Sequence, residues 1–302
     1  MEKSLFKWCK VINRNERLKS HFTAPLPAEK KEMDLKEVYC LHVSIETPIS
    51  RFIVPATNPL TAMTKDVLLI QNITHETGGM IESMLEAAGI EPYRVDLSKG
   101  ERIPDPRTFQ AIVVLGGPQS ANDQSPAMLH LLDTIRTILE QEISYLGICL
   151  GMQALVKAAG GSVVKSPVKE IGTHDGSGIP FSISLTDAGR ADPLFRNMES
   201  PVAVYQLHGE TVVLPECGTT LLATGTHCHH QAVRAGNKAY GLQCHVELTR
   251  DLLTKWIRHD ADLRLMDKER QLEQFDTMAP LYRQAGSTLI ANFMATANLP
   301  LP

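Results

Sequence analysis

Short apolar runs alternate with amphipathic segments along the chain from residue 66 onward. The runs have the length of buried strands, and the segments repeat apolar side chains at three- and four-residue spacing, as helices with one buried face do. We predict strands at residues 67–71, 93–97, 111–115 and 143–147, and helices at residues 78–88, 126–140 and 152–159. This alternation is typical of an α/β fold, in which helices cover both faces of a mostly parallel central sheet.

The second half of the chain continues with shorter apolar runs and closes with a long amphipathic stretch. We predict partly antiparallel strands at residues 181–185, 202–207, 220–223, 231–234 and 239–243, followed by a helical tail over residues 249–297. No segment after residue 66 is rich enough in Pro, Gly or Ser to separate two domains. Residues 63–302 are therefore expected to form one domain that includes the C-terminal helices.

Residues 1–62 differ in character from the rest of the chain. Charged residues are mixed there without sustained periodicity, and prolines at five positions would interrupt a long helix or strand. Met63 stands shortly before the first predicted strand. We expect residues 1–62 to be an N-terminal extension, with a composition that disorder would suit, which the fold of the remaining chain does not need.

Composition and charge exclude some classes of protein and do not alter the predicted fold. The chain has 302 residues, a formal net charge of −4 and a pI near 6.3, so no basic surface for nucleic acid or anionic lipid is predicted. No apolar run reaches the ~20 residues that span a bilayer, and the start lacks the apolar stretch of a signal peptide. The six cysteines are too sparse and irregular for a secreted disulfide framework. We expect a cytoplasmic protein with no nucleic-acid or membrane partner.

A cysteine between two glycines is the first candidate for chemistry. Cys149 lies in the sequence Gly-Ile-Cys-Leu-Gly-Met-Gln, between a predicted buried strand and a predicted helix. Small residues on both sides allow the tight turn of a nucleophile elbow, which places the thiol at the positive end of the helix. That position favours the thiolate, which is the attacking species in thiol chemistry. A buried structural cysteine is the alternative, and the flanking glycines on a strand-to-helix turn disfavour it.

A histidine and a glutamate two residues apart follow the last predicted strand. Near a strand end, this spacing can place the side chains of His245 and Glu247 on one side of the chain. The carboxylate can then hold one imidazole nitrogen while the other nitrogen faces the thiol. Such a histidine alone is more often structural, but together with Cys149 it predicts a Cys-His-Glu triad.

Two glycines and a proline follow the predicted strand at residues 111–115. Glycines at this position let a backbone amide approach a ligand closely. The amides of Gly117 and Leu150 could together form an oxyanion hole for a tetrahedral intermediate. Taken alone, Gly116-Gly117-Pro118 would be no more than a turn.

These three motifs, in this order and at these intervals, resemble those of class I (triad-type) glutamine amidotransferases. The chain is especially similar to stand-alone proteins related to the amidotransferase domain of GMP synthase, over about residues 66–248. The resemblance implies a three-layer, flavodoxin-like domain. It also implies that Cys149 is the nucleophile, that His245 is the general base and acid, that Glu247 orients it, and that Gly117 and Leu150 donate to the oxyanion.

The resemblance extends to residues that hold the amino-acid end of glutamine in related enzymes. It implies Gln153 on the elbow helix, together with His208, Gly209 and Glu210, as substrate-binding residues. The common form of the second motif is His-Gly-Asp, so the longer Glu210 changes the shape of this pocket. Many relatives also have proline where this chain has Val246, a change that leaves the His-Glu spacing intact.

Three functions remain open from the sequence. The first is glutamine hydrolysis with ammonia passed to a separate synthetase subunit, because the chain contains neither a P-loop nor a Ser-Gly-Gly pyrophosphatase loop. The second is a stand-alone γ-glutamyl peptidase or hydrolase, and the third is a non-catalytic binding module. No cofactor is predicted. No metal site is predicted at residues 227–230 either, because adjacent ligands cannot easily all face one ion.

Overall fold

The computed structural model describes residues 65–302, so the extension predicted for residues 1–62 lies outside the described residues. A nine-stranded sheet runs through this part of the chain in the order β2-β1-β3-β4-β11-β10-β9-β6-β7. Neighbours among the first five strands are parallel, and each later neighbouring pair is antiparallel. The parallel strands are β1 (Lys65–Gln71), β2 (Tyr93–Asp96), β3 (Phe109–Val114), β4 (Ser144–Ile148) and β11 (Ala239–Leu242). The others are β10 (Ala232–Ala235), β9 (Thr219–Thr224), β6 (Ser182–Leu185) and β7 (Val202–Ala203).

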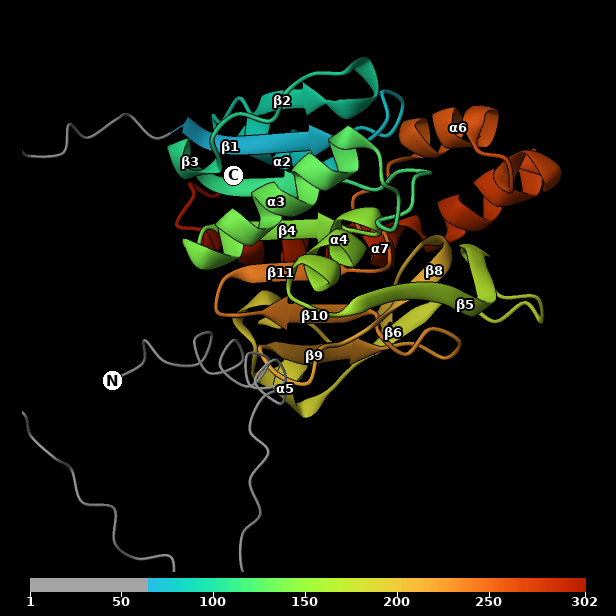
Figure 1. Cartoon of the computed structure of the whole chain (residues 1–302). Coiled ribbons are helices and arrows are strands. Elements are labelled where there is room, and N and C mark those ends of the chain that lie inside the picture. The colour runs from blue at the N-terminus through green and yellow to red at the C-terminus, as the bar shows by residue number, and fades with distance from the viewer. Residues whose placement is uncertain (1–64) are drawn as a thin grey trace, which may run out of the picture. The chain divides into compact units, whose positions relative to one another are not determined.

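Helices cover both faces of this sheet (Figure 1). On one face, α3 (Pro126–Glu140) and α4 (Leu150–Ala158) share a hydrophobic cluster with Leu68 and Ile70 of β1. On the other face, α2 (Met80–Ala87) and α7 (Lys268–Thr296) share a second cluster with Val67 and Leu69. Successive strand residues point to opposite faces, so a strand that is covered on both faces is apolar throughout. The predicted α/β class and its three layers are confirmed.

Local signals set the start of α3, the best-predicted helix. The hydroxyl of Ser125 accepts a hydrogen bond from the Met128 backbone amide at 3.2 Å, and Pro126 occupies the first helical position. A hydroxyl residue followed by proline is a strong helix start, because the first amides have no partner inside the helix. The predicted range of 126–140 matches the observed helix.

A two-stranded antiparallel ribbon departs from the predicted pattern. It pairs β5 (Ser162–Gly172) with β8 (Gln206–Val213). The hydrophobic pattern predicts no strand at residues 162–172, and it merges β7 with the start of β8 into one strand over residues 202–207. Buried positions along β5 are mostly two or three residues apart, so the strict alternation of a half-buried strand is missing.

The predicted helical tail consists of two helices joined by a turn. α6 (Arg250–His259) is followed by the 3-10 turn η5 (Leu263–Leu265) and then by α7, and a third hydrophobic cluster around Trp256 joins α6 to α7. The remaining short elements are α5 (Asp187–Ala191), η2 (Leu97–Lys99), η3 (Pro106–Thr108) and η4 (Pro193–Phe195). Within residues 65–302, none of the helices combines the length and the apolar character that crossing a membrane requires.

Candidate active site

Strand register brings the three predicted motifs to one edge of the sheet. Ile148 of β4 pairs with Leu242 of β11, and Gly147 pairs with Val114 of β3. These strands are parallel, so the segments that follow them emerge side by side at the carboxyl edge, where α/β proteins commonly bind ligands. Cys149, the 243–247 segment and the Gly116-Gly117 turn therefore meet.

Cys149 stands on a strained turn between β4 and α4. Its backbone has φ 49° and ψ −103°, a conformation that side-chain-bearing residues rarely adopt. A Cβ on Gly151 would lie 2.2 Å from the Val114 carbonyl oxygen, and one on Gly147 would lie 2.5 Å from the Gly151 carbonyl carbon. Both glycines are therefore required by close backbone approach. The turn has the geometry of the predicted nucleophile elbow.

The sulfur of Cys149 lies beside a hydrogen-bond donor, a hydrogen-bond acceptor and a helix N-terminus. The side-chain amide of Gln243 donates toward Sγ at 3.6 Å, and the Leu207 carbonyl oxygen lies 3.7 Å from it. The thiol also sits at the N-cap of α4, where unpaired amides give the helix its positive end. A donor and a helix N-terminus both favour the negatively charged sulfur.

His245 and Glu247 form a buried pair beside this thiol. His245 Nδ1 and Glu247 Oε1 are 2.7 Å apart, and the second carboxylate oxygen accepts from the Val246 amide at 2.9 Å. Burial disfavours the protonated imidazole, but the Glu247 charge and hydrogen bonds with Cys149 and Glu247 outweigh it and raise the pKa of His245 well above its usual value. The site thus favours an imidazolium held between a carboxylate and a thiol.

Distant segments fix the backbone and the ring of His245. Its amide and carbonyl group both pair with the backbone of Tyr205, and the Tyr282 hydroxyl of α7 donates to the same carbonyl oxygen at 3.1 Å. The Trp256 ring of α6 packs edge-on against the imidazole, with centroids 4.8 Å apart. These contacts leave the imidazole little rotational freedom.

The Gly116-Gly117 turn is braced by side chains of its neighbours. The Asn72 amide donates to the carbonyl oxygens of Leu115 and Gly116 at 2.7 Å and 3.2 Å, and the Gln119 amide donates to the Asn72 carbonyl oxygen at 2.9 Å. A Cβ on Gly117 would lie 3.4 Å from the Leu150 side chain, so the turn adjoins the start of α4. The amide of Leu150 is the first in that helix and has no partner within it.

The residues predicted to hold substrate lie beside the thiol, but several of their polar groups are already engaged. The Gln153 side-chain amide reaches the Glu210 carbonyl oxygen at 3.2 Å and Gln243 Oε1 at 3.3 Å. His208 and Gly209 lie on β8, and the His208 ring is bonded to Glu170 Oε2 at 2.8 Å and to the Glu210 carbonyl oxygen at 3.1 Å. Glu210 Oε1 accepts from the Ser120 hydroxyl at 3.1 Å. Substrate recognition by these residues remains a prediction.

His208 lies close to Glu170 and to Cys228 of the 227–230 segment, and all three are residue types that can bind a metal ion. The ligand atoms of Glu170, His208 and Cys228 lie within 4.8 Å of one another, and all three side chains are buried. Glu170 also accepts from the Gln231 amide at 3.0 Å, and the Cys228 sulfur lies 3.2 Å from the Thr211 hydroxyl. These hydrogen bonds join the ribbon to the loop between β9 and β10.

Sequence patterns miss several residues that shape the site. Gln243, Glu170, Tyr282 and Glu76 reach it from four different segments, and none of them belongs to a motif that predicts a role. Their contacts depend on strand register and helix packing, which a sequence does not display directly. Only Gln243 carries a signal, because it stands two residues before His245.

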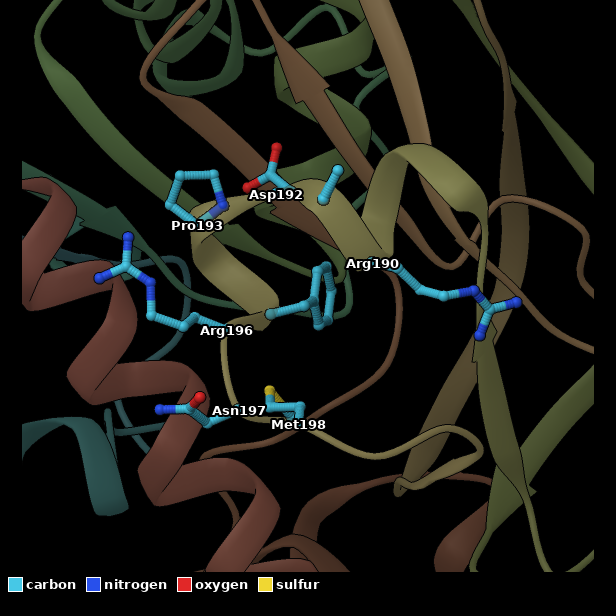
Figure 2. A pocket seen from close by; sticks show the side chains of 8 residues that line it. Arg190, Asp192, Pro193, Arg196, Asn197 and Met198 are labelled. Atoms are coloured by element: carbon cyan, nitrogen blue, oxygen red, sulfur yellow. The ribbon is translucent and has the colours of Figure 1, made fainter.

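A cavity of about 500 Å³ lies away from this site (Figure 2). It borders α5 and η4, and none of its lining residues belongs to the three motifs. Arg190, Asp192 and Arg196 contribute charged groups of both signs to its lining. Cys149, His245 and the Gly116-Gly117 turn, which meet at the carboxyl edge of the sheet, do not line this cavity.

Comparison with known proteins agrees with the geometry. The model of the class-I glutamine amidotransferase family matches residues 75–259. The glutamine amidotransferase-like protein YfeJ of Salmonella typhimurium is 34% identical over 199 residues, covering 62% of this chain and 79% of that protein. GMP synthase of Bacillus subtilis is 26% identical over 194 residues, covering 63% of this chain but only 34% of that enzyme. A glutamine-hydrolysing GMP synthase subunit from Sulfolobus acidocaldarius is 26% identical over 170 residues, covering 56% of this chain and 82% of that protein.

Two solved structures share the fold. A glutamine amidotransferase from Thermotoga maritima superposes with a TM-score of 0.68 at 26% identity, covering 78% of this chain and 98% of that one. A glutamine amidotransferase from Methylobacillus flagellatus gives a TM-score of 0.66 at 25% identity, covering 79% of this chain and 96% of that one.

Proposed function

Because the chain belongs to the class-I glutamine amidotransferase family, we propose that it hydrolyses a γ-glutamyl amide through a thioester on Cys149. The observation that carries the proposal is the His245–Glu247 pair, 2.7 Å apart and buried, beside a thiol on a strained elbow. Glutamine is the first substrate to test, because the family takes its name from transfer of the glutamine amide.

The geometry supports a two-step reaction. The Cys149 thiolate attacks the γ-carbonyl carbon, and the amides of Gly117 and Leu150 stabilise the negative carbonyl oxygen. His245 gives its proton to the leaving nitrogen, so the C–N bond breaks and a thioester remains. His245 then takes a proton from water as the water oxygen attacks the thioester. The C–S bond breaks, glutamate leaves as its γ-carboxylic acid, and the Cys149 thiolate and the imidazolium are restored. Glu247 keeps the imidazole oriented in both steps.

Recognition of the glutamyl end is assigned to Gln153, His208, Gly209 and Glu210. His208, Gly209 and Glu210 follow Leu207 on β8, and the Leu207 carbonyl oxygen lies 3.7 Å from the Cys149 sulfur. This nearness supports the assignment. Gln153 and His208 would hold the pocket wall through the Glu210 carbonyl oxygen, which both contact. Gly209 would leave space for the substrate.

A separate synthetase subunit is the proposed acceptor of ammonia. The match to GMP synthase of Bacillus subtilis spans about a third of that enzyme, whereas the match to the Sulfolobus acidocaldarius protein spans most of a chain that is itself one subunit of a GMP synthase. A stand-alone γ-glutamyl peptidase is the second candidate. Glu210 favours it, because its longer side chain bonds to Ser120 and so reshapes the pocket.

Substrate hydrolysis by matched variants tests the proposal. Purified wild type, Cys149→Ala and His245→Asn would be given glutamine and γ-glutamyl peptides, with ammonia, glutamate and free amine measured. We expect wild-type turnover, and a loss of at least about a thousandfold in both variants, because nucleophile and base act as a unit. His130→Asn, an exposed change on α3, should keep full activity.

The substrate that is cleaved separates the two candidates. Preferential hydrolysis of glutamine supports an amidotransferase, and preferential cleavage of peptides supports a peptidase. If wild type cleaves neither, and a glutamine-like chloroketone leaves Cys149 unlabelled by mass spectrometry, a stand-alone hydrolase is ruled out and a binding role remains.

A further inference from the structure

Glu76 is a carboxylate at the site that the proposed two-step reaction does not use. It lies in the turn between β1 and α2, where its amide donates to the Ile73 carbonyl oxygen at 3.2 Å and its carbonyl oxygen accepts from the Gln71 side chain at 3.2 Å. These bonds fix the backbone of the turn. Among residues 65–302, no group donates a hydrogen bond to the Glu76 carboxylate itself.

The Glu76 carboxylate, the imidazole and the nucleophile converge on Gly116. A Cβ built on Gly116 would lie 3.1 Å from Glu76 Oε2, 3.1 Å from His245 Cε1 and 3.6 Å from the Cys149 Cβ. Cε1 is bonded to Nε2, the nitrogen that Glu247 leaves free, as well as to Nδ1. The absence of a side chain at position 116 therefore lets the Glu76 carboxylate and the His245 ring come close to each other.

The charges around Glu76 set its ionisation near neutrality. Burial raises the pKa of the Glu76 carboxyl to about 7, with His245 opposing the shift and the carboxylates of Glu247 and Asp260 adding to it. These groups come from the segment after β11 and from the end of α6. Glu76 therefore changes charge over the pH range in which thiol hydrolases work.

The attacked carbon carries four groups in the tetrahedral intermediate. Three of them have assigned positions, which leaves one position for the leaving nitrogen. The sulfur comes from Cys149, the oxygen is assigned to the amides of Gly117 and Leu150, and the glutamyl chain is assigned to the β8 side. The remaining group is the leaving nitrogen, which must lie beside His245 Nε2 to receive its proton. Glu76 Oε2 and His245 Cε1 both lie within 3.1 Å of a Cβ built on Gly116, so the carboxylate is close enough to the ring to face a nitrogen beside it.

We propose that the Glu76 carboxylate accepts a hydrogen bond from the leaving nitrogen of the substrate, an inference that rests on the proposed function. As the C–N bond breaks, the proton passes from His245 Nε2 to nitrogen, and Glu76 stabilises the positive charge that grows there without itself taking a proton. The substrates it selects are amides whose leaving group departs as ammonia or a primary amine. An ester, which has no N–H at this position, gains nothing from Glu76.

A pair of substrates tests this role. Wild type and Glu76→Gln would be compared on glutamine and on the γ-methyl ester of glutamate, which differ only in the leaving group. We expect Glu76→Gln to lower kcat/KM for the amide by about tenfold or more, the effect of losing one charge-assisted hydrogen bond, and to change the ester less than about threefold. Glu86→Gln, an exposed change of the same kind on α2, should affect neither substrate.

The pH profile supplies a signature that a structural role would not produce. In wild type, the ratio of amide to ester kcat/KM should rise through about pH 7 as Glu76 ionises, and in Glu76→Gln it should be flat. Equal losses on amide and ester, or no loss on either, would overturn the inference while leaving the proposed function in place. A wild type that hydrolyses neither substrate would overturn both.

Discussion

At the scale of single residues, the Glu76 carboxyl makes folding depend on pH. Its pKa is about 7 in the folded protein against an ordinary 4.5, so the folded state holds its proton over a range in which the unfolded chain has lost it. Stability from this group is therefore fully present below pH 4.5 and decreases as pH rises toward 7. Above that range, the folded protein carries a partly buried charge that the nearby His245 offsets only in part.

We predict that Glu76→Gln stabilises the protein in a pH-dependent manner. At pH 8 the variant should gain up to about 3 kcal/mol in free energy of unfolding, because the neutral amide avoids the cost of a raised carboxyl pKa. At pH 5, about half a unit above the unfolded pKa, the gain should fall to about 1 kcal/mol or less. Denaturant unfolding at both pH values measures it, with Glu86→Gln as the control, and an equal gain at pH 5 and pH 8 would contradict the prediction.

The sequence could indicate that Cys149, His245 and Glu247 lie together because short-range signals mark them, and their catalytic roles stay a prediction. Cys149 has glycines on both sides and an apolar strand before it, and His245 and Glu247 have the spacing of a strand end. Glu76 carries no such signal, and Gln243 is marked only by its place two residues before His245. Their nearness to the thiol follows from the pairing of β11 with β4 and from the course of the turn after β1, and both are properties of the folded chain.

At the scale of elements, α7 forms hydrogen bonds and packing contacts with the loop that contains His245. The Tyr282 hydroxyl donates to the His245 carbonyl oxygen and accepts from the Leu248 amide at 3.0 Å, and the Gly286 backbone lies against the Val246 carbonyl oxygen. A side chain at position 286 would meet that oxygen at 2.4 Å. The helical tail is therefore part of the site's framework.

Removal of the Tyr282 hydroxyl should weaken both stability and activity. Tyr282→Phe leaves the buried Leu248 amide without its partner, which should cost about 1–3 kcal/mol in free energy of unfolding. The loosened His245 loop should also lower kcat. Urea unfolding and hydrolysis rates check this, with the exposed Leu281→Ala on the same helix as the control. Normal values for both quantities in Tyr282→Phe would show that the hydroxyl contact is unimportant.

Elements were predictable where one periodicity governs a whole segment. α3 combines a capping serine, a proline and a regular apolar stripe, so its residues are recovered from sequence. β5 lacks regular alternation because it belongs to a two-stranded ribbon, so its pattern is that of a loop. Because the sequence does not predict β5, it does not identify Glu170 on that strand or the hydrogen bond between Glu170 and the His208 ring.

At the scale of the whole molecule, helices on both faces enclose the sheet within residues 65–302. The two hydrophobic clusters on these faces are built from α2 and α7 on one side and from α3 and α4 on the other. This arrangement supports the expectation that residues 63–302 are sufficient for the fold. The hydrophobic pattern predicts this organisation well, because strands buried on both faces and amphipathic helices have distinct periods.

A shortened chain tests that expectation directly. Protein beginning at Met63 should fold cooperatively and melt within a few degrees of the full chain. Its Cys149 should also react with a glutamine-like chloroketone at the same rate as in the full chain. Circular dichroism and labelling kinetics measure both properties. Aggregation of the shortened chain, or a large fall in its melting temperature, would assign residues 1–62 a part in folding.

The bond from Tyr282 to the loop of the base also orders events during synthesis. The ribosome adds Cys149 first and His245 almost a hundred residues later. Tyr282, whose hydroxyl bonds to the His245 carbonyl oxygen, is added later still. Chains fold from the N-terminus as they emerge, so the sheet can assemble while its catalytic loop still lacks its anchor. An unfinished or prematurely terminated chain would therefore hold a thiol without a positioned base. The proposed hydrolysis would then require a chain that has been translated past Tyr282.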